Sequence, residues 1–275
     1  MTDAPPKRSS KARLDVVLVE RGLAPSRERA RALILAGRVL VNEQKVDKPG
    51  AAVAADAALR MLGEDQPYVS RGGLKLAAAL EHWSIAVTGR ACLDVGASTG
   101  GFTDCLLQHG AAHVTAVDTG FGQIAMKLRN DARVRLMERT NARLLEPGSL
   151  AARPGDRELT LLTMDVSFIS ATLLLGPVLV AAPSLAEAII LVKPQFEAGR
   201  EHVGKGGIVR DPAAHQLAIN KVAECVRSLG WGVVETIPAP IAGAEGNREF
   251  LLYARRPAVE PTEILAAMAR NNPER

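Results

Sequence analysis

The sequence contains few aromatic residues. Phenylalanine, tryptophan and tyrosine together make up 3% of the 275 residues, so a surface that recognises nucleobases by stacking is not the obvious mode of nucleic-acid binding. Cysteine is also scarce, because Cys92, Cys105 and Cys225 are odd in number and show no C-x-x-C spacing. This pattern argues against a disulfide framework and against a zinc site. It favours a reducing compartment, and we expect a cytoplasmic protein.

One long uncharged segment has to be weighed as a membrane span. Val166 to Ala186 carries no charge and is about as long as a spanning helix needs to be. It contains Pro177 and Pro183, however, and it follows directly on Asp165. Because proline interrupts helical hydrogen bonding, a helix buried behind a parallel sheet explains the segment better. The first 13 residues are polar, basic and proline-containing, unlike a secretory signal peptide.

Positive charge is concentrated at the N-terminus. Residues 1–60 hold 12 Lys and Arg against 7 Asp and Glu, a net charge of +5, and residues 61–275 hold 22 against 23, a net charge of −1. This asymmetry is typical of a small nucleic-acid-binding module joined to a near-neutral enzyme. A basic solubilising tail would carry the same charge, but the segment also shows the pattern of a folded unit.

The basic segment is predicted to contain two helices and an extended stretch. The first helix runs from Arg13 to Gly22, and the second runs from an N-cap at Ser26 to Ala36. Arg38 to Asn42 is predicted to be extended and is followed by a polar turn. Residues 1–12 are expected to form a disordered tail, and residues 61–69 a linker.

The stretch from Arg13 to about Arg60 resembles the S4-like RNA-binding domain. It carries the landmarks R-G-L, S-R-x-x-A, G-x-V-x-V-N and K-P. The resemblance implies that two helices and a hairpin form a surface whose basic side chains meet the phosphates of folded RNA, with recognition mostly by shape. The residues expected on that surface are Arg27, Arg31, Arg38, Lys45 and Lys48.

A glycine-rich turn lies at the centre of the remaining chain. Asp94 to Asp104 reads D-V-G-A-S-T-G-G-F-T-D and stands between an apolar run and a segment that can be helical. Strand, turn and helix in this order present backbone N–H groups to a ligand. The glycine spacing is G-x-x-x-G-G and not the G-x-G-x-x-G of dinucleotide sites, so an NAD-dependent oxidoreductase is the weakest alternative. The form resembles motif I of S-adenosylmethionine (SAM)-dependent methyltransferases.

A second strand adds to the predicted cofactor site. His113 to Asp118 ends in an acid that can accept hydrogen bonds from both ribose hydroxyls. By the same family resemblance, Asn141 is expected near the adenine and Phe102 in the wall of the pocket. The residues expected to bind SAM are Asp94, Gly96, Ala97, Ser98, Gly100, Gly101, Phe102, Asp118 and Asn141.

Strands and helices alternate from Cys92 onward, which predicts a mainly parallel, doubly wound sheet. The fold class is therefore α/β: a Rossmann-like methyltransferase domain over residues 70–275, with a small N-terminal α+β domain over residues 13–60. The expected strands are Cys92–Val95, Val114–Asp118, Val134–Glu138, Leu159–Asp165, Ala188–Lys193, Gly232–Ile237 and Glu249–Ala254. Residues 194–211 form a long glycine-rich connection, expected to be a mobile lid or a substrate loop.

Four ionisable residues stand at the predicted ligand edge of the sheet. Lys75, Asp165, Lys193 and Glu249 resemble, in type and chain order, the tetrad of FtsJ-type ribose 2′-O-methyltransferases. A ribose hydroxyl ionises far above neutral pH, so a base must remove its proton, and a lysine does so when burial or a nearby cation lowers its pKa. We expect Lys193 as the base, Lys75 as the cation, Asp165 orienting Lys193, and Glu249 holding Lys75 or the nucleotide. No metal is required.

From Arg13 to Tyr253 the chain resembles the TlyA family, also called the hemolysin A group. The shared landmarks are VSRGGLKL, CLDVGASTGGFTD, LRNDARV, ERTNAR, DVSFIS, LVKPQFE and GNREF. The resemblance implies SAM-dependent 2′-O-methylation of cytidine in ribosomal RNA, with 16S RNA, 23S RNA or both as the substrate. Members that act on both carry short terminal extensions, and the helical pattern Pro261–Arg270 hints at that kind. The family's Arg-Ala-Trp-Val linker is replaced by Gln66-Pro67-Tyr68-Val69, which leaves the role of the linker open.

Two further classes of function stay open. A membrane-acting hemolysin needs an amphipathic or spanning segment, and the one candidate is broken by two prolines. A non-catalytic RNA-binding protein could retain a methyltransferase fold, although the complete tetrad and motif I argue against it.

Overall fold

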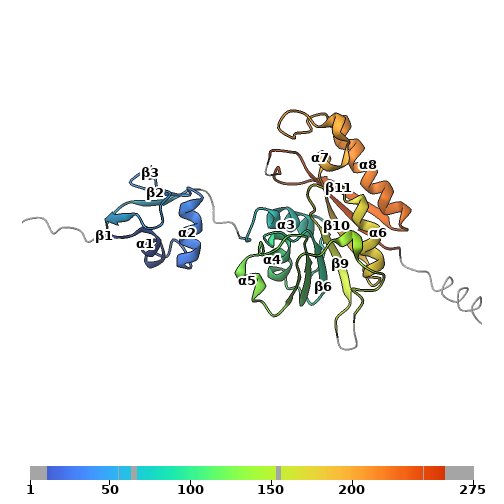
Figure 1. Cartoon of the computed structure of the whole chain (residues 1–275), viewed down its shortest axis with the longest axis horizontal. Helices are drawn as coiled ribbons and strands as arrows, with labels where there is room; N and C mark the ends of the chain where they lie inside the picture. The colour runs from blue at the N-terminus through green and yellow to red at the C-terminus, as the bar shows by residue number, and fades with distance from the viewer. Residues whose placement is uncertain (1–10, 55, 63–66, 153–155, 244, 258–275) are drawn as a thin grey trace, which may run out of the picture. The chain divides into compact units, whose positions relative to one another are not determined.

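The computed structural model describes residues 11–54, 56–62, 67–152, 156–243 and 245–257 (Figure 1). The chain divides into two compact units, with the boundary between Asp65 and Gln66. The predicted tail at Pro261–Arg270 and most of the predicted disordered N-terminus lie outside the described residues.

The N-terminal unit packs two helices against short strands. Its hydrophobic core includes Leu14, Leu18 and Ile34, all fully buried. The predicted cap of the second helix is confirmed, because Ser26 Oγ accepts a hydrogen bond from Arg29 N at 3.2 Å. The elements are β1 (Lys11–Arg13), α1 (Leu14–Glu20), α2 (Arg27–Leu35), β2 (Val39–Val41), β3 (Gln44–Lys45), β4 (Ala52–Ala54) and β5 (Leu59–Met61).

Two strands extend this unit beyond the predicted helices and hairpin. Lys11 and Ala12, expected in the tail, belong to β1, which pairs with β4. Met61, expected in the linker, belongs to β5, which pairs with β2 and completes a three-stranded sheet in the order β3-β2-β5. Leu59 and Met61 pack on the core while Arg60 is exposed. This alternation is typical of a strand with one buried face, and it was too short to recognise in the sequence.

A buried carboxylate ties the start of α1 to the start of α2. Asp15 is fully buried and accepts hydrogen bonds from Arg13 Nε and Arg13 Nη2, both at 2.9 Å, and from Arg27 Nη2 at 3.2 Å. The hydrogen bonds from Arg13 are the main cause that lowers the pKa of Asp15 to about 2. Arg27 was expected only as an RNA contact, but the structure also gives it a part in holding the fold together.

The C-terminal unit is built on a seven-stranded sheet in the order β11-β12-β10-β9-β6-β7-β8. Strands β8, β7, β6, β9 and β10 are parallel to one another, and β12 runs antiparallel to both of its neighbours, β10 and β11. Its strands are β6 (Ala91–Val95), β7 (His113–Val117), β8 (Val134–Met137), β9 (Leu159–Met164), β10 (Glu187–Val192), β11 (Gly232–Pro238) and β12 (Phe250–Arg255). The predicted α/β fold with a mainly parallel sheet is confirmed.

Helices cover both faces of this sheet (Figure 1). Residues of α3 and α4 share a hydrophobic cluster with one face, and residues of α6 and α8 share a second cluster with the other. The helices are α3 (Gly72–His82), α4 (Gly101–Gln108), α5 (Met126–Arg129), α6 (Thr172–Ala181), α7 (Pro194–Glu197) and α8 (Pro212–Ser228), with the 3-10 turns η1 (Ala142–Leu144) and η2 (Arg200–His202).

The uncharged segment from Val166 to Ala186 contributes only one helix of moderate length. It forms the turn after β9 and then α6, in which Leu175 and Val178 are fully buried and Pro177 lies inside the helix. In the described parts of the chain, every helix falls short of the length and apolar character that crossing a membrane requires.

The antiparallel direction of β12 decides where Glu249 lies. Phe250, the first residue of β12, pairs with Val192, the last residue of β10. Glu249 and Lys193 are the next residues beyond this pair, at the edge where the parallel strands end. The reversal therefore brings a residue from the far end of the chain to the carboxyl edge of the sheet.

We expect Asp15→Asn to destabilise the N-terminal unit by about 1 kcal/mol at neutral pH. The effect is no larger because Arg13 and Arg27 are more than half exposed, so that water screens their charges. Since folding lowers the pKa of Asp15 from 3.8 to about 2, its contribution is present above about pH 4 and is lost as the pH falls towards 2. Hydrogen exchange of the amides of α1 and α2, followed over this range, measures both effects. The exposed Asp47→Asn is the control, and equal protection in both variants would contradict the prediction.

Candidate active site

The glycine-rich turn after β6 is packed against the end of β9. Gly96 has a φ of +85°, and a Cβ added to it would lie 2.3 Å from the carbonyl oxygen of Asp165. A Cβ on Gly101 would lie 2.3 Å from Ser70 Oγ. Both positions require glycine because the protein's own chain approaches them. Gly100 precedes α4 with a φ of +96°, in the left-handed region.

Asp94 lies beneath this turn and not in the wall of a cavity. It is fully buried, and it accepts hydrogen bonds from Thr103 Oγ1 at 2.6 Å and from Thr163 Oγ1 at 3.0 Å. Burial raises the pKa of Asp94 to about 7. Its contacts join β6 to α4 and β9, so its observed role is to hold the turn in place.

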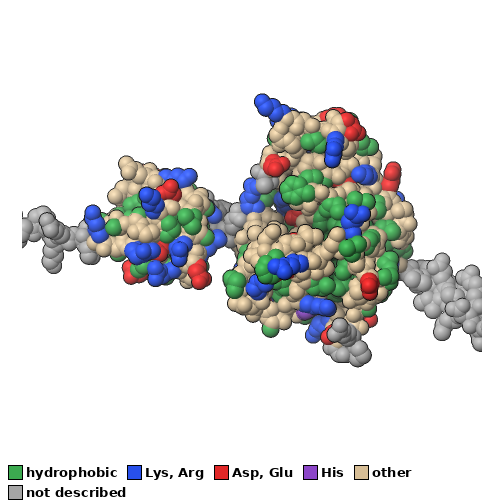
Figure 2. Space-filling model, viewed as in Figure 1, with side chains coloured by type: hydrophobic (Ala, Val, Ile, Leu, Met, Phe, Trp, Pro, Cys, Tyr) green, Lys and Arg blue, Asp and Glu red, His purple; other side chains and the backbone are tan. Residues whose placement is uncertain are grey.

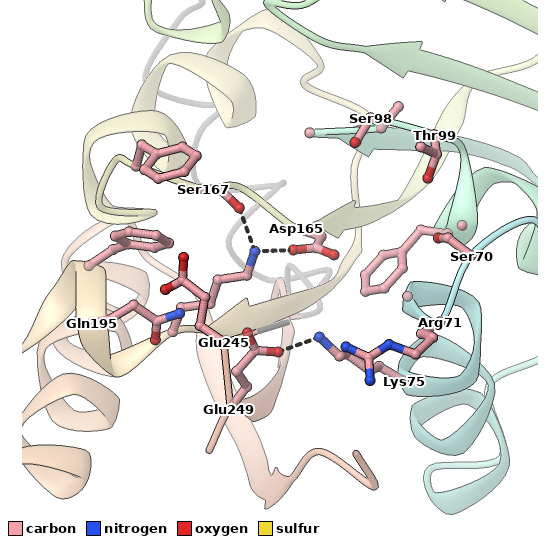
Figure 3. Close-up of a pocket in the computed structure, with 18 residues that line it drawn as sticks. Ser70, Arg71, Lys75, Ser98, Thr99, Asp165, Ser167, Gln195, Glu245 and Glu249 are labelled. Atoms are coloured by element: carbon pink, nitrogen blue, oxygen red, sulfur yellow. Dashed lines mark hydrogen bonds and ion pairs between the residues drawn. The ribbon is translucent and has the colours of Figure 1, made fainter. Parts of the chain in front are cut away.

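A cavity of about 540 Å³ opens at the carboxyl edge of the sheet (Figure 3). Two ion pairs face each other there. Lys75 pairs with Glu249, and Lys193 Nζ lies 2.6 Å from Asp165 Oδ1. Lys75, Lys193 and Glu249 are each less than 10% exposed. All four residues of the predicted tetrad therefore line one cavity.

The amine of Lys193 has a second partner that the sequence did not indicate. Lys193 Nζ donates a hydrogen bond to Ser167 Oγ at 2.8 Å. Its contact with Asp165 Oδ1 is a close ion pair that lacks the angles of a hydrogen bond. The hydrogen bond to Ser167 is thus the directional one of the two.

A second cavity, of about 350 Å³, adjoins the first. The two share Gly96, Ser98, Asp165, Ser167 and Phe168 in their walls, so they lie next to each other. The second cavity is also lined by Asp118, Gly120, Gln123, Thr140 and Asn141, which are polar or small. Of the predicted cofactor residues, Gly96, Ala97, Ser98, Gly101, Phe102, Asp118 and Asn141 line one cavity or the other.

Asp118 is already engaged with the backbone of its own site. Its two oxygens accept hydrogen bonds from Ser98 N at 2.8 Å and from Gly120 N at 2.6 Å. A carboxylate has about four acceptor positions, so positions for ligand hydroxyls remain. Asp118 therefore links the glycine-rich turn to the loop after β7 and still faces the second cavity.

Several residues of the cavity wall were absent from the predicted site. Phe168 is 89% exposed, has a φ of +64°, and its ring centroid lies 5.5 Å from that of Phe196. The segments DVSFIS and LVKPQFE, which the resemblance singled out without assigning roles, contain Ser167, Phe168, Gln195 and Phe196, and VSRGGLKL contains Ser70 and Arg71. The additional wall residues include Ser70, Arg71, Ser167, Phe168, Gln195, Phe196 and Glu245.

The segment that departs from the family pattern is attached to α4. Asp104 Oδ2 accepts a hydrogen bond from Val69 N at 2.8 Å, and Gln108 Nε2 donates to the carbonyl oxygen of Pro67 at 2.8 Å. Tyr68 is buried against Gly73, where an added Cβ would lie 2.3 Å from the tyrosine ring. Residues 67–69 are thus held by the helix that follows motif I.

The glycine-rich connection after β10 contains regular structure and side-chain hydrogen bonds. It begins with α7 and continues through η2, and a buried asparagine holds its later part. Asn247 Oδ1 accepts from Val209 N at 2.9 Å, and Asn247 Nδ2 donates to the carbonyl oxygen of Gly207 at 2.8 Å. The part of the connection that reaches the cavity is its beginning, Gln195 and Phe196, and not its glycines.

Lys and Arg side chains gather on the visible face of the N-terminal unit (Figure 2). Of the predicted RNA contacts, Arg27, Arg31, Lys45 and Lys48 are exposed. Arg27 pairs with Asp15, and Arg38 Nε donates to the carbonyl oxygen of Leu62 at 2.8 Å. In the described parts of the chain, no cluster of His, Cys, Asp and Glu could hold a metal ion.

Comparison with known proteins identifies both units. Residues 68–256 match the family of FtsJ-like methyltransferases, and residues 12–58 match the S4 domain. The 16S/23S rRNA (cytidine-2′-O)-methyltransferase TlyA of Mycobacterium tuberculosis is 46% identical over 246 residues, which covers 89% of this chain and 90% of that protein. Hemolysin A of Brachyspira hyodysenteriae is 39% identical over 241 residues, covering 88% and 98%.

A relative from Campylobacter jejuni is named for 23S rRNA alone. This 23S rRNA (cytidine-2′-O)-methyltransferase TlyA is 37% identical over 187 residues, which covers 68% of this chain and 70% of the relative. A solved structure from Streptococcus thermophilus, described as a candidate hemolysin, superposes with a TM-score of 0.68 at 39% identity and covers 95% of this chain and 96% of that one. With an S4 domain at its N-terminus, the chain belongs to the FtsJ-like methyltransferase family.

Proposed function

We propose that this protein methylates the ribose 2′-hydroxyl of a cytidine in ribosomal RNA, with SAM as the methyl donor. The observation that carries the proposal is the position of the Lys193 amine beside Asp165, in a cavity that shares wall residues with the one that Asp118 lines. The relatives named as rRNA (cytidine-2′-O)-methyltransferases support the nature of the substrate.

The residues of the two cavities fit the proposed cofactor. The bare backbone at Gly96 and Gly101 forms a narrow turn, and the polar wall around Asp118 and Asn141 suits an adenosine. When bound, SAM would supply an electrophilic methyl group. We assign the contacts in the wall to Gly96, Ala97, Ser98, Gly101, Phe102, Asp118 and Asn141, with Asp94 and Gly100 shaping the turn.

Lys193 is the proposed general base. In its deprotonated form the amine would accept the proton of the 2′-hydroxyl, and SAM would supply the methyl group that the ribose oxygen takes up. Asp165 then stabilises the ammonium ion that forms, since a nearby opposite charge favours the charged form of a lysine. The pair of Lys75 and Glu249 forms the facing wall, where it can position the nucleotide.

RNA recognition is assigned mainly to the N-terminal unit. We propose the N-terminal unit, with Lys11 and Met61 in its strands, as the RNA-binding domain, and the C-terminal unit, which holds residues 67–69, as the methyltransferase domain. Exposed basic residues such as Arg31, Lys45 and Lys48 contact phosphates, so that the unit reads the shape of a ribosomal subunit. One relative is named for 16S and 23S rRNA, and another is named for 23S rRNA alone. The experiment below distinguishes these two cases for this protein.

The proposed function is tested by methyl transfer from labelled SAM to isolated small and large ribosomal subunits. We expect label in rRNA at one ribose per substrate, which makes the adjacent phosphodiester resistant to alkali. The number of labelled subunits shows whether the enzyme serves one or both. SAM binding with no transfer to either subunit would favour the non-catalytic RNA-binding alternative.

Lys193→Ala should lower the rate of methyl transfer by at least about 100-fold, because a positioned general base contributes roughly that much or more. The dissociation constant of SAM, measured by calorimetry, should stay near the wild-type value. Lys205→Ala removes an exposed lysine and is the matched control. A Lys193→Ala protein with most of its activity would remove Lys193 as the base.

Asp118→Ala should weaken SAM binding by about tenfold or more, since hydrogen bonds to a charged group contribute about 1.5–3 kcal/mol. Part of this loss comes from the glycine-rich turn, because Ser98 N loses its acceptor. Calorimetric titration with SAM measures the change, and the exposed Glu146→Ala is the control. Unchanged affinity would show that the second cavity does not hold the ribose.

Arg31→Gln and Lys48→Gln should each weaken binding to ribosomal subunits and reduce the slope of log K against log salt by about one. Arg27 is left intact in these variants because it also holds Asp15. Arg227→Gln, an exposed arginine of α8, is the control for the change in net charge. An equal effect in all three variants would mean that the N-terminal unit is not the specific contact.

A further inference from the structure

The amine of Lys193 is held from two sides by the turn that follows β9. Ser167 Oγ accepts a hydrogen bond from Lys193 Nζ at 2.8 Å, and Asp165 Oδ1 lies 2.6 Å from the same nitrogen (Figure 3). Asp165 and Ser167 are separated by one residue, and both line the two cavities. One short turn therefore supplies both partners of the proposed base.

The two contacts differ in how strongly they depend on the direction of the N–H groups of Lys193. The ion pair with Asp165 lacks the angles of a hydrogen bond and attracts the nitrogen in almost any rotation about the Cε–Nζ bond. The hydrogen bond to Ser167 is directional, because its strength depends on where the N–H points. Ser167 is thus the residue that selects one rotation of the amine.

We propose that Ser167 is a positioning residue that aims the lone pair of Lys193 at the ribose hydroxyl. This proposal rests on the function proposed above. A neutral lysine amine has two N–H groups and one lone pair in tetrahedral directions around the nitrogen. When one N–H points to Ser167 and the other lies toward Asp165, the lone pair takes the remaining direction. The 2′-hydroxyl must approach along that direction to give up its proton.

The turn that carries Ser167 is fixed to the segment that carries Lys193. Glu197, four residues after Lys193, is buried and accepts hydrogen bonds from Ser170 Oγ at 2.5 Å and from Ala171 N at 2.6 Å. These hydrogen bonds attach the start of α6 to α7. They therefore help to fix the distance between Ser167, shortly before α6, and Lys193, directly before α7. A rigid support of this kind is what orientation of a catalytic group requires.

Ser167 is suited to mutation because its contribution to the fold is small. Its side chain is exposed to the cavity and is not part of a hydrophobic cluster. Among the described residues, its side chain makes one hydrogen bond, to Lys193. Removal of the hydroxyl should therefore change the orientation of the amine and leave the surrounding structure intact.

The test compares Ser167→Ala, Ser167→Thr and wild-type protein in single-turnover methyl transfer to ribosomal subunits at saturating SAM. We expect Ser167→Ala to lower the rate at saturating subunit about tenfold or more. The KM for the subunit and the dissociation constant of SAM should stay within about twofold. Ser167→Thr keeps a hydroxyl acceptor and should recover most of the rate. Ser228→Ala, an exposed serine of α8, is the control and should match the wild type.

The remaining outcomes overturn the proposal, each for a stated reason. A wild-type rate in Ser167→Ala would show that the hydrogen bond does not orient the base. A higher KM at an unchanged maximal rate would assign Ser167 to RNA binding. Equal losses in the alanine and threonine variants would point to packing and not to the hydroxyl. Absence of transfer by the wild type would overturn the proposed function as well, whereas transfer with an unaffected Ser167→Ala would overturn only this inference.

Discussion

The close approach of β9 to the glycine-rich turn is the constraint on which the active site depends. Asp165 N donates a hydrogen bond to the carbonyl oxygen of Val95, and the carbonyl oxygen of Asp165 lies where a Cβ on Gly96 would be. This contact places the predicted cofactor turn and the partner of Lys193 within one small volume. A side chain at position 96 would push β9 away and separate the two functions of the site.

The direction of β12 completes the arrangement. In an all-parallel sheet, a strand that followed β11 would present its last residue, and not its first, to the ligand edge. Because β12 is antiparallel to β10, Glu249 stands beside the end of β10 and reaches Lys75 on α3. Four segments distant in sequence thus meet at one cavity. The buried Asn247, two residues earlier, holds the connection after β10 to the same segment.

The strands could be predicted because apolar runs in the sequence mark them. The family resemblance led us to expect the pairs of Asp165 with Lys193 and of Glu249 with Lys75, and the structure places these residues together. Other partners depend on register between distant segments, and they were missed. Ser167 was quoted only within a motif, and Arg27 was expected on a free surface although it pairs with Asp15. Asp94 was expected at the ligand, but Thr103 and Thr163 enclose it.

The balance of charge in the cavity agrees with the proposed chemistry. Lys75 and Glu249 neutralise each other, which leaves Asp165 and Lys193 to accommodate the charge that moves during transfer. In the proposed reaction SAM would bring one positive charge to this site, and Lys193 would carry one positive charge after it accepts the proton of the hydroxyl. The Asp165 carboxylate would lie beside a positive charge in both cases. The total charge of the site would then be the same before and after transfer, so a low-dielectric cavity would not oppose the reaction.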